Sequence, residues 1–122
     1  MVLVDTSVWI DHFRAGEARL AGLLEDVEVV MHPLVVGELA CGNLRNRREI
    51  LSLLCNLPRV AQVSKDEVLF FIERQRLHGR GLGLVDIHLL ASCAVEGNGL
   101  WSKDVRLMKT AKDLKLAVRL GA

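Results

Sequence analysis

The sequence is poor in the features that mark unusual classes of protein. Of its 122 residues only two are prolines, no polar low-complexity tract occurs, and 51% are hydrophobic, which excludes an intrinsically disordered chain. No apolar run reaches the length of a transmembrane helix, and the N-terminus lacks the basic region and long apolar core of a signal peptide. We therefore expect a cytoplasmic protein with no membrane partner.

Net charge and cysteine content are also low. The formal net charge is +1, so the overall field predicts no partner, and any nucleic-acid binding must come from a local basic patch. The three cysteines, Cys41, Cys55 and Cys93, are an odd set without a close pair, and each lies among aliphatic residues. We expect all three to be small core residues in a reducing cytoplasm.

The opening run of the chain predicts the centre of the fold. Val2, Leu3 and Val4 form an unalternated apolar run, which is typical of a strand buried on both faces of a parallel sheet. Asp5 follows directly. In open parallel sheets chemistry gathers at the carboxyl ends of the strands, so Asp5 is the first candidate for a functional residue.

The rest of the chain alternates between short apolar segments and helical patterns. Thr6 or Ser7 is the expected cap of the first helix, and Ser64 with Glu67 forms a capping box. A chain of this length has room for one core, so we predict a single domain over residues 1–122, a three-layer α/β/α sandwich with a mainly parallel sheet. Further strands are predicted over residues 27–31, 59–63, 100–101 and 116–120, and helices over 8–13, 17–24, 34–41, 46–56, 65–78, 85–95 and 105–114.

Four of the fifteen acidic residues are not placed like solvated surface groups. Asp5 and Asp104 follow predicted strands, whereas Glu38 and Asp86 extend the apolar faces of predicted helices. A lone buried carboxylate costs several kcal/mol unless it is paired or binds a cation. Oxygen ligands without His or Cys favour Mg²⁺ or Mn²⁺, and such a site suits the hydrolysis of phosphodiesters by a metal-activated water.

Each acid also has a purely structural interpretation, which the spacing leaves open. Asp5 and Asp104 could cap the helices that follow them, and Asp86 is a favourable acid in the first turn of a helix. Glu38 could pair with Arg45.

The combined pattern resembles a family, the PIN-domain ribonucleases, and within it the VapC toxins of toxin–antitoxin pairs. The resemblance spans nearly the whole chain, and all four family acids have a match in the right order. It is carried by VDTSVWI at residues 4–10, PLVVGEL at 33–39, VDIHLLA at 85–91 and LWSKD at 100–104.

The resemblance implies a parallel α/β/α sandwich whose acids meet at one end of the sheet. It implies an RNA substrate, one or two Mg²⁺ or Mn²⁺ ions, a homodimer and an inhibiting antitoxin protein. The sequence departs from the family at Val105 and Leu107, where many relatives have a further acid and an aromatic, and this puts a second metal in doubt. By the same resemblance Asp5, Glu38, Asp86 and Asp104 are the catalytic and metal-binding acids, supported by the hydroxyls of Thr6, Ser7 and Ser102.

Two basic groups adjoin the predicted acids in sequence. They could bind RNA phosphates, or they could form solvated basic faces. The RNA-binding candidates are Arg45, Arg47, Arg48, Arg76 and Arg80.

The remaining aromatic and imidazole side chains have other expected roles. Trp9 and Phe13 are expected in the core or in a dimer contact, because the chain has only 4% aromatic residues. His12, His32 and His88 are expected to be structural, because a metal-activated water needs no histidine base.

Two competing functions belong to other classes. A signalling receiver domain is also a doubly wound sheet that uses Mg²⁺, but it needs an acidic pair after the first strand, and Asp5 stands alone. A non-catalytic PIN-like module that binds RNA or protein would lack some of the four acids.

Overall fold

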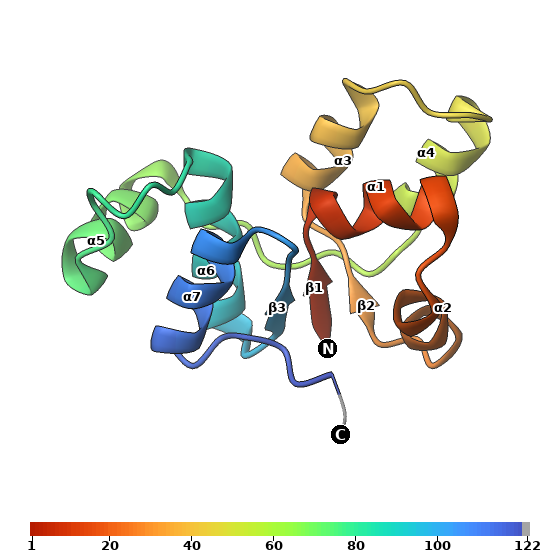
Figure 1. The fold of residues 1–122 in the computed structure, drawn as a ribbon. Coiled ribbons are helices and arrows are strands. Elements are labelled where there is room, and N and C mark those ends of the chain that lie inside the picture. The colour runs from red at the N-terminus through yellow and green to blue at the C-terminus, as the bar shows by residue number, and fades with distance from the viewer. Residues whose placement is uncertain (121–122) are drawn as a thin grey trace.

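A computed structural model describes residues 1–120 and places a short parallel sheet between two groups of helices (Figure 1). The strands are β1 (Val2–Val4), β2 (Val29–Val30) and β3 (Gly99–Trp101), in the order β2-β1-β3. Leu3 of β1 is in register with Val30 on one side and with Leu100 on the other. As predicted, β1 is buried on both faces, because neighbouring strands and helices surround it.

Seven helices flank this sheet in the described part of the chain. Figure 1 shows α5, α6 and α7 grouped on the β3 side and α1 to α4 grouped on the side of β1 and β2. The predicted three-layer α/β/α sandwich is confirmed. The helices are α1 (Thr6–Ala15), α2 (Ala18–Glu25), α3 (Pro33–Ala40), α4 (Arg47–Cys55), α5 (Lys65–Gln75), α6 (Leu84–Glu96) and α7 (Val105–Asp113).

The strand order locates the functional edge of the sheet. The chain runs from β1 outward to β2 and then returns to the other side of β1 for β3. This reversal puts the switch point of the topology at the carboxyl ends of β1 and β3, where ligands bind in open α/β sheets. Asp5 and Ser102 are the residues directly after these two strands, and the Asp5 N–H donates to the carbonyl of Trp101 at 2.8 Å.

Two predicted strands, 59–63 and 116–120, are wrong: each is reduced to a single parallel bridge, Arg59 with Met31 and Ala117 with Leu100. In the first case side chains of α6 form hydrogen bonds with backbone groups that would otherwise pair with a neighbouring strand. The Ala61 N–H donates to the Glu96 carboxylate at 2.6 Å, and its carbonyl accepts from Ser92.

Helix ends also differ from the prediction by a few residues. The fifth helix ends at Gln75 and not near residue 78, because Arg76 adopts the left-handed conformation (φ 53°). The Leu77 N–H then donates to the carbonyl of Ile72, which closes the helix and buries the Leu77 side chain.

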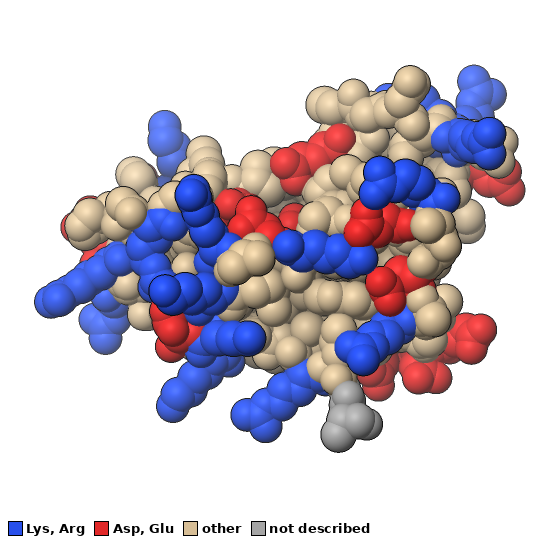
Figure 2. Space-filling view, in the orientation of Figure 1, with Lys and Arg blue, Asp and Glu red and all other residues tan. Residues whose placement is uncertain are grey.

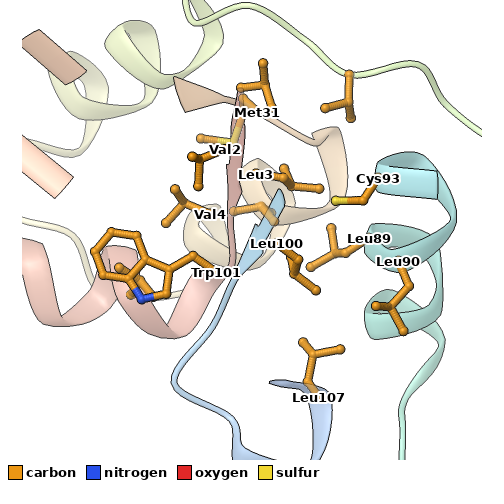
Figure 3. Packing of buried hydrophobic residues seen from close by; sticks show 14 of the residues in the cluster. Val2, Leu3, Val4, Met31, Leu89, Leu90, Cys93, Leu100, Trp101 and Leu107 are labelled. Carbon is orange, nitrogen blue, oxygen red and sulfur yellow. The ribbon is translucent and has the colours of Figure 1, made fainter. Parts of the chain in front are cut away.

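The core is built on β1 and on the helices that pack beside β3 (Figure 3). Cys93 of α6 lies in this core, and burial raises the pKa of its thiol to about 12. Cys41 and Cys55 are exposed, so the prediction that all three cysteines are core residues is wrong. Both lie at helix ends, where the chain turns back into solvent.

The apolar side chains of α1 and α4 differ in how deeply they are buried. Trp9 of α1 is 2% exposed and stacks on Phe13, with ring centroids 5.7 Å apart. Of the apolar side chains on α4, Leu54 is buried, whereas Leu53 is 59% exposed. Within residues 1–120, no helix has both the length and the apolar character needed to cross a bilayer.

Candidate functional site

Asp5, at the end of β1, is held by three hydrogen bonds. Its Oδ1 accepts from the Thr6 N–H at 2.8 Å, and its Oδ2 accepts from the hydroxyls of Ser102 at 2.6 Å and Ser7 at 3.2 Å. Asp5 itself is therefore the N-cap of α1, and the expectation that Thr6 or Ser7 caps this helix is wrong. A carboxylate offers about four acceptor positions, so about one remains on this 7% exposed residue.

The same hydroxyls fasten the turn after β3 to the end of β1. Ser7 Oγ accepts from the Lys103 N–H at 3.0 Å, and Ser102 Oγ accepts from the Asp104 N–H at 3.0 Å. Each serine thus accepts from the backbone of the turn and donates to Asp5. This arrangement brings Asp104 to Asp5 across nearly the whole length of the chain.

Asp104 lies at the rim of this edge of the sheet. It is the N-cap of α7, and its Oδ1 accepts from the Leu107 N–H at 3.1 Å. The side chain is exposed, so the expectation that it is buried is wrong. One of its carboxylate oxygens therefore caps α7, while the side chain remains accessible to solvent.

Glu38 reaches the site from α3 through a hydroxyl. Thr6 Oγ1 donates to Glu38 Oε1 at 2.6 Å, and α1 packs on α3. Glu38 is exposed, because Val35 and Leu39 take the buried face of α3. Among the described residues Glu38 forms no ion pair, so the proposed pairing with Arg45 does not occur.

Asp86, in the first turn of α6, shows that the four acids share one region. Its Oδ2 accepts from the Gly83 N–H at 3.0 Å. Burial raises its pKa, the Gly83 hydrogen bond opposes this, and the charges of Asp5, Asp104 and Glu38 raise it further. We call these four carboxylates the acidic centre. Figure 2 shows acidic side chains in a hollow between the two groups of helices.

No basic side chain in residues 1–120 forms an ion pair with the acidic centre. Lys103, which is adjacent to it in sequence, instead binds Asp11 at 2.7 Å and Glu17 at 3.3 Å. The hydrogen bond with Asp11 raises the pKa of Lys103. Within the described residues the centre therefore has no contact ion pair, and the helix N-termini beside it contribute a partial positive charge.

The spacing of the acids limits how they could hold a cation. Within residues 1–120, no three His, Cys, Asp or Glu side chains lie close enough together to ligate one ion unaided. Mg²⁺ usually keeps several waters and is bound through one or two carboxylates. A set of carboxylates without His or Cys fits an ion of that kind, and it does not fit a fully protein-ligated zinc site.

Comparison with known proteins decides the family. The model of the PIN domain family matches residues 2–113, almost the whole chain. The chain belongs to the PIN-domain family. Two curated relatives, both called Ribonuclease VapC32, come from the CDC 1551 / Oshkosh and H37Rv strains of Mycobacterium tuberculosis. Each is 50% identical over 119 residues, which cover 97% of this chain and 96% of the relative, and so the chain is a VapC-type member.

Beside the acids, this PIN domain contains a buried histidine that caps a helix, an interaction not predicted from the sequence. His32 follows β2 and caps α3, with Nδ1 accepting from the Leu34 N–H at 3.0 Å. Its Nε2 has no hydrogen-bond partner among the described residues. Burial, with a smaller contribution from His88, lowers its pKa to about 4. His32 is structural, as expected, but only its place before Pro33 could have indicated the cap.

The arginines proposed to bind RNA are partly engaged within this PIN domain. Arg47 donates to the carbonyls of Ala40 and Gly42, at the end of α3. Arg80 pairs with Asp113 at 2.6 Å. Arg45 lines a pocket of about 640 Å³ together with Glu38 and apolar residues of α1 and α4. The RNA-binding role of these arginines stays a prediction, as does that of Arg48 and Arg76.

Proposed function

We propose that this PIN domain is a metal-dependent endoribonuclease of the VapC type, acting as the toxin of a toxin–antitoxin pair. One observation carries the proposal: four carboxylates from four elements gather at the carboxyl edge of a parallel sheet without a cationic partner. The 50% identity to a relative named as a ribonuclease supports it. The repulsion among the acids is the property expected of a site that awaits a divalent cation.

The residues divide into direct and indirect roles. Asp5 and Asp86 are the proposed direct ligands of Mg²⁺ or Mn²⁺, and Glu38 and Asp104 are proposed to hold water around the ion or ions. When bound, such a cation lowers the pKa of a water and stabilises negative charge on the phosphate. Ser7 and Ser102 orient Asp5, and Thr6 orients Glu38.

Three helices add to the field at this point. The acids cap or open α1, α6 and α7, so the N-termini of all three face the centre. Each N-terminus carries a partial positive charge, which favours an anionic phosphate nearby. Capping and catalysis are compatible here, because a capping carboxylate keeps acceptor positions free.

The proposed partners follow from the same family. We propose an RNA substrate, a cognate antitoxin protein, a homodimer and a cytoplasmic location. Trp9 is buried within its own chain, so it is not available for a dimer contact. Exposed Phe70 and Leu69 of α5 are among the apolar side chains that remain available for an interface. Light scattering at micromolar concentration tests this assembly.

Cleavage assays on purified protein test the proposed function. We expect the parent to cleave RNA internally with Mg²⁺ or Mn²⁺, and EDTA to abolish cleavage. Asp86→Asn should lower the rate by about two orders of magnitude or more, since it removes a ligand and a charge from the centre. Sequencing of RNA 5′ ends after induction would identify the cleavage position. A parent that binds RNA but never cleaves it with either ion would favour the non-catalytic module instead.

A further inference from the structure

The surface of α7 beside Asp104 carries two lysines that form no salt bridge within residues 1–120. A second pocket, open to solvent and about 430 Å³ in volume, joins the acidic centre to the surface of α7. Figure 2 shows basic side chains gathered over the α6–α7 side of the hollow. The pocket is lined by Ser102, Lys103, Asp104, Val105, Met108, Lys109 and Lys112.

The basic residues of this region differ in whether they form an ion pair. Arg106 lies over the loop before α6, with Nη1 2.9 Å from the position that a Cβ on Gly81 would take. Arg80 of the same loop pairs with Asp113. Lys109 and Lys112 are exposed, and neither forms a salt bridge within residues 1–120.

The two lysines are placed at regular distances from the acidic centre. With the rise of an α-helix, Lys109 and Lys112 lie about 7.5 Å and about 12 Å along α7 from Asp104. Val105, which is 82% exposed, and the partly buried Met108 lie between them and the centre. The pocket therefore passes from the Asp104 carboxylate through an apolar patch to two ammonium groups.

We infer that Lys109 and Lys112 bind backbone phosphates of the RNA that neighbour the cleaved phosphate. Val105 and Met108 then contact the sugars or bases of the same strand. A lysine is a compact charge suited to a phosphate oxygen, and a strand at the acidic centre must continue along one of its walls. An acidic protein segment fits less well, because it would place carboxylates beside Asp104. The inference rests on the proposed nuclease function.

The test compares two variants that each lose two positive charges. Lys109→Gln with Lys112→Gln alters the pocket, and Arg19→Gln with Lys65→Gln is the matched control, since Arg19 and Lys65 are exposed on α2 and α5. Relative to the control, the pocket variant should show roughly tenfold higher KM and little change in kcat. In fluorescence anisotropy with a labelled single-stranded RNA, its log–log salt slope should be smaller by about 1.4.

The readouts separate the inference from the proposed function. If the parent cleaves RNA and both variants share its KM and salt slope, the lysine path is wrong while the nuclease stands. If the parent binds the RNA without cleaving it, the nuclease proposal fails, and the anisotropy comparison still decides the lysine path. A parent that binds no RNA overturns both. Thermal melts check folding, and a lower melting temperature for the pocket variant alone, with unchanged RNA affinity, would make the lysines structural.

Discussion

Asp5 and His32 occupy comparable places after two neighbouring strands but differ in how fully their polar atoms are hydrogen-bonded. Asp5 follows β1 and His32 follows β2, and both are buried N-caps of the next helix. Both Asp5 oxygens accept hydrogen bonds, and two of these bonds come from the hydroxyls of Ser7 and Ser102. His32 has an Nε2 without a partner in the described chain and a pKa of about 4, so it stays neutral. The same strand-to-helix junction thus holds a proposed metal-binding acid in one case and serves only the fold in the other.

The largest effect should come from acidifying the protein. His32 has a folded pKa near 4 against an ordinary 6.5, so its protonation favours the unfolded state. The free energy of unfolding should be highest above pH 6.5 and should lose about 3 kcal/mol by pH 4. His32→Asn keeps an acceptor for the Leu34 N–H and should abolish most of this loss.

Urea unfolding at several pH values measures this loss. His78→Asn is the control, because His78 is exposed. Equal pH dependence in the parent and in His32→Asn would show that His32 is not the titrating group. Cleavage by His32→Asn at pH 7 should stay close to that of the parent, unlike cleavage by Asp86→Asn.

A divalent cation should separate Asp5 from Asp86. In EDTA at pH 7, Asp86→Asn should be at least as stable as the parent, because it removes repulsion and keeps the bond from Gly83. Asp5→Asn should be less stable, because an amide NH₂ would face two hydroxyl donors. Mn²⁺ at a hundred times its dissociation constant should stabilise the parent by about 2.7 kcal/mol, and both variants much less.

Thermal melts with EDTA and with Mn²⁺ measure these differences. If Mn²⁺ shifts the parent and both variants equally, the acids do not hold the ion. If Asp86→Asn melts lower than the parent in EDTA, the carboxylate is mainly a helix cap.

A smaller effect should follow from removing a hydroxyl. Ser102 donates to the buried Asp5 carboxylate, and hydrogen bonds to charged groups contribute about 1.5–3 kcal/mol. Ser102→Ala should therefore cost about 2 kcal/mol of unfolding free energy. Ser92→Ala is a matched control, because Ser92 is also buried but donates to a neutral carbonyl of Ala61, so about 1 kcal/mol is expected there. Denaturant unfolding measures both losses, and equal losses of unfolding free energy in the two variants would contradict the stronger Ser102–Asp5 hydrogen bond.

The sequence predicts those parts of the fold that depend on apolar pattern. The burial of β1 and the helix around Asp86 follow from which residues are apolar and where they stop. The family resemblance adds the roles of the four acids, which the pattern alone leaves open. Such apolar patterns depend on short stretches of sequence, and the α/β/α sandwich buries the apolar face of each stretch.

The features that sequence reasoning missed depend on competition between partners. Residues 59–63 have strand character, but the side chains of Glu96 and Ser92 claim the backbone of Ala61. The sequence suggests that Arg47 is a free basic group, whereas in the structure it donates to carbonyls at the end of α3. Glu38 lies on a helix with little polar surface, and only the packing of α1 on α3 determines that it faces the rim. Such outcomes need three-dimensional positions.

The hydrogen bonds from Ser102 and Lys103 to the Asp5–Ser7 turn also determine when the site can exist. They join residues 96 and 97 positions apart in sequence. Since a chain is synthesised from its N-terminus, a growing chain contains Asp5 long before it contains the serine that orients it. If the proposed function holds, a ribosome making this protein carries no assembled nuclease until residue 104 has been added. The cell's own translation machinery is then separated in time from the activity it produces.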